Sequence, residues 1–201
     1  MAAHGLGRDD SRSLMDQHFT EAPLDPPEGF ILHKDTISDV EELQLLERFD
    51  DLRWDPIVIR GQTARRTAHH FGLTYDYESR APREGESIPA WLARARTAAA
   101  ALAGIKPAEW RQVLVQRYPP GAAIGWHRDS PAFGMVAGIS VRGTARLRLR
   151  RGEVRNWETW ETELLPRSGY VLSGAARWSW QHSIPPAREL RYSITFRTLQ
   201  A

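Results

Sequence analysis

Apolar and polar residues alternate in short runs throughout the second half of the chain, with turn-forming residues between the runs. Alternation with a period of two predicts strands that bury one face. We expect strands over residues 112–118, 123–127, 135–141, 145–151, 157–165, 169–173, 178–184 and 190–198. Eight short strands with turns between them are typical of a sandwich or a jelly roll.

The first half of the chain mixes helices with shorter strands. Residues 29–33 and 56–59 favour strands because each is a brief apolar run. Ser38 is placed to cap a helix, and Glu41, three residues on, supplies the partner of a capping box. A second helix is expected over residues 89–103, beginning at a proline.

One domain is expected, because 201 residues suit a single sizeable core. Residues 1–28 are polar and proline-containing, which indicates a flexible N-terminal arm before a domain over 29–201. Within that domain, residues 112–198 would form the barrel core. Residues 60–87 are rich in Arg, His, Tyr and Gly without clear periodicity, so we expect a long loop that could serve as a substrate lid.

Composition excludes some classes of function and leaves one feature to explain. The chain has no cysteine, which excludes disulfides, zinc fingers and thiol nucleophiles. It has no apolar run of membrane-spanning length and no apolar signal core over residues 1–22, so a cytoplasmic protein without a membrane partner is expected. Of its 27 basic residues only Lys34 and Lys106 are lysines. Arginine suits planar, bidentate partners such as phosphate and carboxylate, although simple solvated arginines remain the alternative.

The strongest local signal for chemistry lies at the end of the second expected strand. His127 and Asp129 are two residues apart, so on an extended segment they point to the same side. His182, near the end of a later expected strand, could supply a third ligand. Two histidines and one carboxylate on one face of a metal are the ligand set of non-haem Fe(II) oxygenases. An isolated His-x-Asp pair also arises by chance on protein surfaces.

A second signal is the alternation near the end of the chain. Arg191, Ser193 and Arg197 share one face of an expected strand whose other face is apolar. That polar face could simply meet water, as in an ordinary edge strand. It could instead face a barrel interior, where guanidinium groups would pair with the carboxylates of a ligand such as 2-oxoglutarate. Gln116 and Tyr118, on one face of another strand, could complete such a site.

Taken together, four segments resemble the AlkB family of Fe(II)/2-oxoglutarate dioxygenases. They are residues 116–129, 139–141, 174–184 and 191–197, and their order and spacing agree with the family across about 113–198. The first contains a Gln-Arg-Tyr, a Pro-Gly and the His-x-Asp. The last matches the family's Arg-x₅-Arg motif.

The resemblance implies a mainly β fold with flanking N-terminal helices, built as a double-stranded β-helix, that is, a jelly-roll or cupin-like barrel. It implies Fe(II) bound by the catalytic residues His127, Asp129 and His182. The residues expected to hold 2-oxoglutarate are Gln116, Arg117, Tyr118, Arg191, Ser193 and Arg197. Arg191 would pair with the distal carboxylate, and Arg197 would support Asp129 and the end nearer the metal.

The activity that the resemblance implies is that of an oxidoreductase using O₂ to demethylate N-alkylated bases in DNA or RNA, releasing formaldehyde, succinate and CO₂. The partner would be single-stranded alkylated nucleic acid, and the protein a monomer. A hydroxylase or demethylase acting on a protein side chain or a small molecule is the alternative, and a non-enzymatic barrel is a third hypothesis. Pro131 stands where the DNA-repair prototype of the family has an aspartate that contacts the base, so base recognition must differ.

Residues of the expected lid are candidates for substrate binding. They are Arg66, Phe71, Tyr75 and Tyr77, with Arg60, Arg65, Arg80 and Arg83 as further candidates for phosphate contacts. The alternative is that the aromatic residues cover the barrel and the arginines are solvated. Trp178 and Trp180 are expected to pack in the core beside the metal, and Arg177 to face either the pocket or an ion pair.

Overall fold

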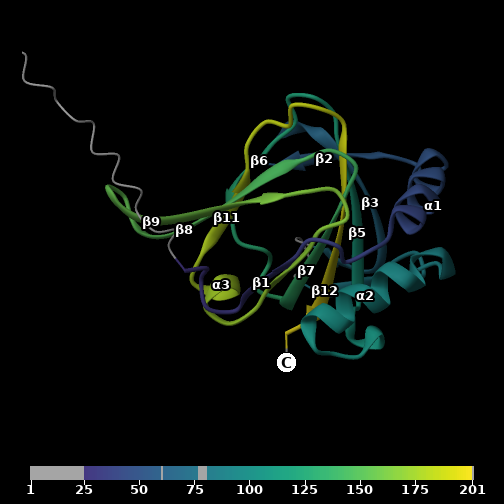
Figure 1. The fold of residues 1–201 in the computed structure, drawn as a ribbon, viewed down its shortest axis with the longest axis horizontal. Coiled ribbons are helices and arrows are strands. Elements are labelled where there is room, and N and C mark those ends of the chain that lie inside the picture. The colour runs from purple at the N-terminus through teal and green to yellow at the C-terminus, as the bar shows by residue number, and fades with distance from the viewer. Residues whose placement is uncertain (1–24, 60, 77–80, 201) are drawn as a thin grey trace, which may run out of the picture.

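The computed structural model describes residues 25–59, 61–76 and 81–200. Its strands form two antiparallel sheets, one of eight strands and one of four, and α1 and α2 cover the side of the larger sheet that faces away from the smaller one (Figure 1). The expected mainly β class with flanking helices is therefore confirmed. The two sheets remain separate in the described part of the chain, so the jelly roll is an open one and not a closed barrel.

The larger sheet runs in the order β1-β10-β7-β12-β5-β3-β2, with β4 paired to β3. Its strands are β1 (Phe30–His33), β2 (Asp55–Ile59), β3 (Gln62–Asp76), β4 (Ala81–Glu84), β5 (Gln112–Tyr118), β7 (Phe133–Val141), β10 (Gly169–Leu172) and β12 (Arg191–Leu199). Strand β12 lies between β5 and β7. The alternation along β12 therefore decides which side chains reach each side of the sheet.

The smaller sheet runs in the order β6-β11-β8-β9. Its strands are β6 (Ile124–His127), β8 (Ala145–Glu153), β9 (Asn156–Leu164) and β11 (Gln181–Ile184). Strands β8 and β9 form a long hairpin that projects from the body of the molecule (Figure 1). The pairing of β6 with β11 places His127 directly opposite His182.

The described residues also contain five short helical segments. They are α1 (Asp39–Asp50), η1 (Ala90–Leu92), α2 (Ala93–Ala103), η2 (Pro107–Glu109) and α3 (Gly174–Trp178). One core lies between the helices and the larger sheet, and Phe49, Ala99, Ile194 and Phe196 are buried in it. A second core, which includes Leu147, lies between the two sheets. The apolar face of β12 belongs to the first core, so its polar face points to the space between the sheets.

The start of α1 carries the expected capping box. The Ser38 hydroxyl accepts from the backbone N–H of Glu41, and the Glu41 carboxylate accepts from the backbone N–H of Ser38 at 2.8 Å. We expect Ser38→Ala to lower the free energy of unfolding by about 1 kcal/mol. Urea unfolding followed by circular dichroism measures this, with Ser87→Ala, on an exposed loop, as the matched control. Equal losses in the two variants would contradict a role for the cap.

The prediction of a long loop over residues 60–87 is wrong. Most of that segment is β3, which pairs with β2 and β5, followed by β4. Its alternation is hard to detect because polar residues such as Arg66 and His70 occupy the face toward the interior cavity, where apolar residues would normally stand. A polar cavity thus removes the pattern by which a strand is recognised.

The prediction of one strand over residues 178–184 is also wrong at its start. Residues 174–178 form the short helix α3, and β11 begins only at Gln181. Consequently Trp178 is 42% exposed and not part of the core, whereas Trp180 is buried in the core between the sheets, as expected. The other expected strands agree with the structure to within a few residues, and 112–118 coincides with β5.

Candidate functional site

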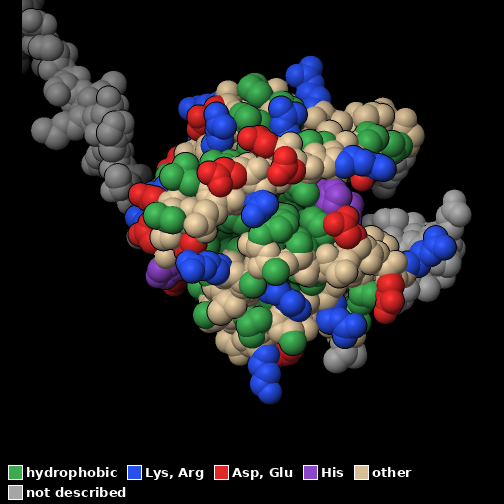
Figure 2. Space-filling view, turned by 90° about the vertical axis from the view of Figure 1, so that its right-hand side faces the viewer, with side chains coloured by type: hydrophobic (Ala, Val, Ile, Leu, Met, Phe, Trp, Pro, Cys, Tyr) green, Lys and Arg blue, Asp and Glu red, His purple; other side chains and the backbone are tan. Residues whose placement is uncertain are grey.

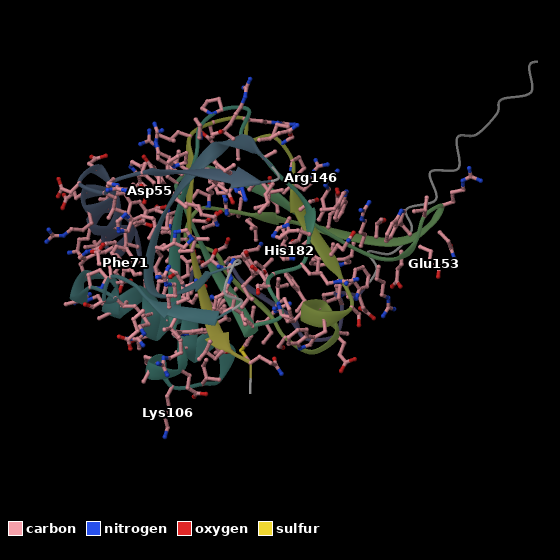
Figure 3. All side chains as sticks on the ribbon, turned by 180° about the vertical axis from the view of Figure 1, so that it is seen from behind. Asp55, Phe71, Lys106, Arg146, Glu153 and His182 are labelled. Carbon is pink, nitrogen blue, oxygen red and sulfur yellow. The ribbon has the colours of Figure 1, made fainter. Side chains whose placement is uncertain are left out.

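A cavity of about 1120 Å³ lies between the two sheets. Its walls come from strands of both sheets, including β5, β12 and β3 on one side and β6 and β11 on the other. Figure 3 shows His182, on β11, near the middle of the molecule. The polar faces of β5 and β12 line this space, so their buried polar groups have a cavity, and not bulk water, as their environment.

Three side chains that could bind a metal meet on one wall of this cavity. One ligand atom each from His127, Asp129 and His182 lies within 4.8 Å of the other two. The antiparallel register of β6 and β11 brings the imidazoles together, with ring centroids 4.2 Å apart. Asp129 follows two residues after His127, and its Oδ2 lies 3.5 Å from Nε2 of His182. This donor set fits a divalent metal with further coordination positions left open.

The orientation of His127 is set by a backbone carbonyl. Its Nδ1 lies 2.9 Å from the carbonyl oxygen of Gly125. A carbonyl can only accept, so the proton must be on Nδ1 of His127. The lone pair of the neutral ring is then on Nε2, which would be the atom that binds a metal. Holding a metal-binding imidazole through its other nitrogen is the usual way in which proteins fix the tautomer.

The three groups also have suitable charge states. Burial alone would raise the pKa of Asp129, but the charge of Arg197 and the two neighbouring histidines outweigh it and hold that pKa well below its usual range. Burial lowers the pKa of His182 to about 4, and it lowers the pKa of His127 as well. At neutral pH the set is therefore one carboxylate and two neutral imidazoles, which is the protonation state that metal binding requires.

Arg197, on β12, is hydrogen-bonded to the carboxylate of Asp129. Its Nη2 donates to Oδ1 of Asp129, and its Nη1 donates to Oε1 of Gln112 at 2.6 Å. The Nε of Arg197 is buried and has no hydrogen-bond partner among the described residues. The guanidinium thus fixes the carboxylate of Asp129 and keeps one N–H donor for another acceptor.

Arg191, six residues earlier on β12, lies deep in the same cavity with 1% of its surface exposed. Its Nε donates to the hydroxyl of Ser140 at 3.2 Å, and its guanidinium lies 5.2 Å from the ring centroid of Tyr118. Nη1 of Arg191 is buried and lacks a partner in the described part of the chain. Burial lowers the pKa of Arg191. A buried cation without a counter-ion is costly, and an anion in the cavity would relieve that cost.

Two further polar side chains from β5 line the cavity beside Arg191. The hydroxyl of Tyr118 donates to Oε1 of Gln116 at 3.3 Å, and Nε2 of Gln116 donates to Thr195 at 3.5 Å. Ser193 is buried on the same face of β12. The unpaired donors of Arg191 and Arg197, with these neutral groups between them, fit a dicarboxylate such as 2-oxoglutarate.

The structure brings together most, not all, of the residues singled out in the sequence. The cavity is lined by His127, Asp129, His182, Gln116, Tyr118, Arg191, Ser193, Arg197 and Arg66. Arg117 is absent from the lining because its neighbours on β5 occupy the inner face. Phe71 is also absent, since it is 1% exposed in the helix-side core against Trp91. The side chain of Tyr75 and all of Tyr77, Arg60 and Arg80 lie outside the described residues, whereas Arg65 and Arg83 are exposed.

Some residues of the site were not anticipated from the sequence. Gln112, Ser140 and Tyr170 are buried around the two arginines. Gln112 could have been found, because it is four residues before Gln116 on an expected strand and so lies on the same face. Ser140 and Tyr170 carried no signal, since each stands in an apolar strand whose facing partner is known only from the sheet pairing.

Arg177 has a role that the sequence did not suggest. It is buried, and it donates to the carbonyl oxygens of Ser130, Phe133 and Gly134 at 2.9, 2.6 and 2.7 Å. Arg177 therefore does not line the cavity and forms no ion pair with a residue that the structure describes, so neither of the two expectations holds. By fixing the loop that follows Asp129, Arg177 helps to hold that carboxylate in place.

Comparison with known proteins gives a family and a set of relatives. A family model described as the 2OG-Fe(II) oxygenase superfamily matches residues 33–197. An Arabidopsis thaliana protein named "Alkylated DNA repair protein ALKBH8 homolog" is 29% identical over 182 residues, which cover 78% of this chain and 51% of that protein. The chain spans about half the length of the curated relatives it matches.

Solved structures share the fold at low sequence identity. The structure of OsALKBH1 matches with a TM-score of 0.67 and 17% identity, over 88% of this chain and 99% of that one. A prolyl hydroxylase from Trichoplax adhaerens, in complex with a hypoxia inducible factor peptide, matches with a TM-score of 0.60 and 13% identity, over 86% and 84%. No helix among the described residues is long and apolar enough to span a membrane.

Proposed function

The chain belongs to the 2OG-Fe(II) oxygenase superfamily, whose members use Fe(II), 2-oxoglutarate and O₂, and on this premise we propose that it removes N-linked methyl groups from bases of single-stranded DNA or RNA. The products would be the free base, formaldehyde, succinate and CO₂. The observation that carries the proposal is the convergence, in one cavity, of the three metal ligands with two buried arginines whose donors are not all used.

In the proposed reaction, His127, Asp129 and His182 would hold Fe(II). When bound, the metal would supply O₂ activation, coupled to oxidative decarboxylation of 2-oxoglutarate, so that a C–H bond of the methyl group is hydroxylated. The N–C bond of the product N–CH₂OH would then break and release formaldehyde, and the hydroxyl proton would pass to the base nitrogen, or to water where the methylated base was a cation. Arg197 keeps Asp129 ionised and oriented throughout, because its guanidinium is hydrogen-bonded to that carboxylate.

Arg191 is proposed to bind the distal carboxylate of 2-oxoglutarate. The burial of its guanidinium and the unpaired Nη1 support this role. Tyr118, Gln116 and Ser193 would contact the same cosubstrate from β5 and β12, since all three line the cavity next to Arg191. Burial on this side keeps water away from the ion pair, which strengthens it.

The nucleic-acid substrate is supported by the name of the Arabidopsis thaliana relative, an alkylated DNA repair protein. A base must leave the stack, or come from a single strand, to reach groups inside a cavity. Arg66 is the candidate for contact with that base. Its side chain is 6% exposed, lines the cavity and has a buried Nε without a partner in the described part of the chain.

Mass spectrometry of N-methylated oligonucleotides tests the proposal. Single-stranded DNA and RNA are incubated in parallel without O₂, and then with O₂, Fe(II) and 2-oxoglutarate. We expect the mass of one CH₂ to be lost per methylated base, and only when all three components are present. Succinate formed without any change in either oligonucleotide would contradict the nucleic-acid substrate and favour a protein or a small molecule.

A further inference from the structure

The outer face of the smaller sheet carries stacked arginine and tryptophan side chains. The guanidinium of Arg150 lies 4.4 Å from the ring centroid of Trp126 and 4.1 Å from that of Trp157. The guanidinium of Arg148 lies 5.0 Å from Trp126. These four residues, from β6, β8 and β9, are called the arginine–tryptophan ladder below. Stacking on an aromatic face holds a guanidinium in place while its edges remain able to donate.

The two arginines of the ladder have neutral hydrogen-bond partners. Nε of Arg150 donates to the side chain of Gln181 at 2.9 Å, and Nε of Arg148 donates to the hydroxyl of Ser183 at 3.3 Å. On the neighbouring strand β9, the residue directly opposite Arg150 is Thr159. Within the described ranges, neither arginine has an ion-pair partner.

Two other arginines of β8 are neutralised instead. Arg146 pairs with Glu161 at 3.4 Å, and Arg151 pairs with Glu158 at 2.5 Å. Glu161 is the cross-strand neighbour of Arg148, yet its carboxylate makes its ion pair with Arg146. The same strand therefore displays two paired and two unpaired guanidinium groups. The unpaired ones stack on Trp126 and Trp157, whereas the ion-paired Arg151 stacks on Trp180, 4.9 Å from its ring centroid.

The ladder is continuous with the rim of the cavity. Trp126 directly precedes the metal ligand His127, and both Trp126 and the exposed Arg128 line the cavity. From there β8 runs outward from Arg146, near the body, to Glu153 at the tip of the hairpin (Figure 3). The face that carries α1 and α2 has basic and acidic side chains interspersed (Figure 2).

We infer that the ladder binds the phosphate backbone of the single-stranded nucleic acid that flanks the nucleotide in the cavity. This inference rests on the proposed function, and adds to it a surface outside the cavity. Unneutralised guanidinium groups give bidentate donors for phosphate, and tryptophan rings beside them suit unstacked bases. A ladder needed only to stiffen the hairpin would gain from acidic partners of the kind that Arg146 and Arg151 have.

The test measures oligonucleotide binding as a function of salt. Fluorescence anisotropy with a labelled single-stranded oligonucleotide gives the slope of log K against log salt concentration. For single strands each lost phosphate contact reduces this slope by about 0.7, so R148Q/R150Q should reduce it by about 1.4. The control R146Q/R151Q removes the same two positive charges from the same strand and should change the slope much less. R148K/R150K, which keeps both charges, should retain most of the slope even if the glutamine variant does not fold.

The possible results separate the surface from the proposed function. Suppose that the wild type binds the oligonucleotide, and that the slope is unchanged in R148Q/R150Q or falls equally in R146Q/R151Q. Either result would refute phosphate binding by the ladder without affecting the proposed function. If the wild type bound no oligonucleotide, both would fall. If poly-glutamate competed as well as an oligonucleotide of equal charge, the surface would be a general polyanion site, and its assignment to nucleic acid would be overturned.

Discussion

Asp129→Ala should remove detectable turnover and weaken Fe(II) binding. Even the outer partners of metal ligands are worth about 10–100-fold in affinity or activity, so loss of a direct ligand should cost more than about 100-fold. Succinate formation measures turnover, and competition with a chelator measures Fe(II) affinity. Asp35→Ala, an exposed position on a surface loop, is the matched control and should behave like the wild type.

Asp129→Asn separates the loss of charge from the loss of packing. The amide has nearly the same shape, so the side-chain environment beside Arg197 is largely kept, while the anionic ligand is lost. We expect this variant to fold and still to fail in metal binding. Wild-type turnover in either variant would show that the carboxylate is not a ligand, and would end the assignment of the triad.

Arg191→Ala should mainly raise the KM for 2-oxoglutarate. Removing one partner of a buried ion pair costs about 3–5 kcal/mol, which corresponds to a change in affinity of roughly 100-fold or more. The value of kcat at saturating cosubstrate should fall less, because the contacts of Arg191 are with Ser140 and Tyr118 and not with the proposed metal ligands. Steady-state kinetics with varied 2-oxoglutarate separates the two effects, and Arg191→Lys, which keeps the charge, should lie between the wild type and the alanine variant.

A cosubstrate without a distal carboxylate makes this second prediction more specific. The wild type should strongly prefer 2-oxoglutarate over 2-oxobutyrate, which lacks that group. Arg191→Ala should lose most of this preference, because removing the guanidinium weakens binding only of the cosubstrate that has the distal carboxylate. An unaltered preference in the variant would mean that another guanidinium, such as that of Arg66, binds the distal carboxylate.

The parts of the site that could be predicted from the sequence lie on strands with one apolar face. In β12 the apolar residues Tyr192, Ile194 and Phe196 face the helices, so the alternation itself assigns Arg191 and Arg197 to the other face. In β5 the alternation assigns Gln116 and Tyr118 to the cavity face in the same way. The apposition of His127 and His182 could not be predicted from periodicity, because it depends on the pairing of β6 with β11.

Strand β3 could not be recognised in the sequence, because one of its faces borders the cavity of the proposed active site. A strand that borders a polar cavity carries residues such as Arg66 and His70 where a core strand would carry valine or isoleucine. Its pattern then resembles that of a loop. The hydrogen bonds of Arg177 could not be predicted either. Its partners are backbone carbonyl oxygens within residues 130–134, and every residue has such an oxygen, so the sequence does not indicate which ones Arg177 binds.

An anaerobic titration of the chain tests directly whether this cavity holds Fe(II) and 2-oxoglutarate together. When 2-oxoglutarate chelates protein-bound Fe(II), a visible charge-transfer absorption develops, which neither component gives alone. We expect this absorption to saturate at one equivalent of each component and to be lost in His182→Ala. If no such absorption developed in the wild type, or if it persisted unchanged in that variant, the cavity would not be the site that holds the two together.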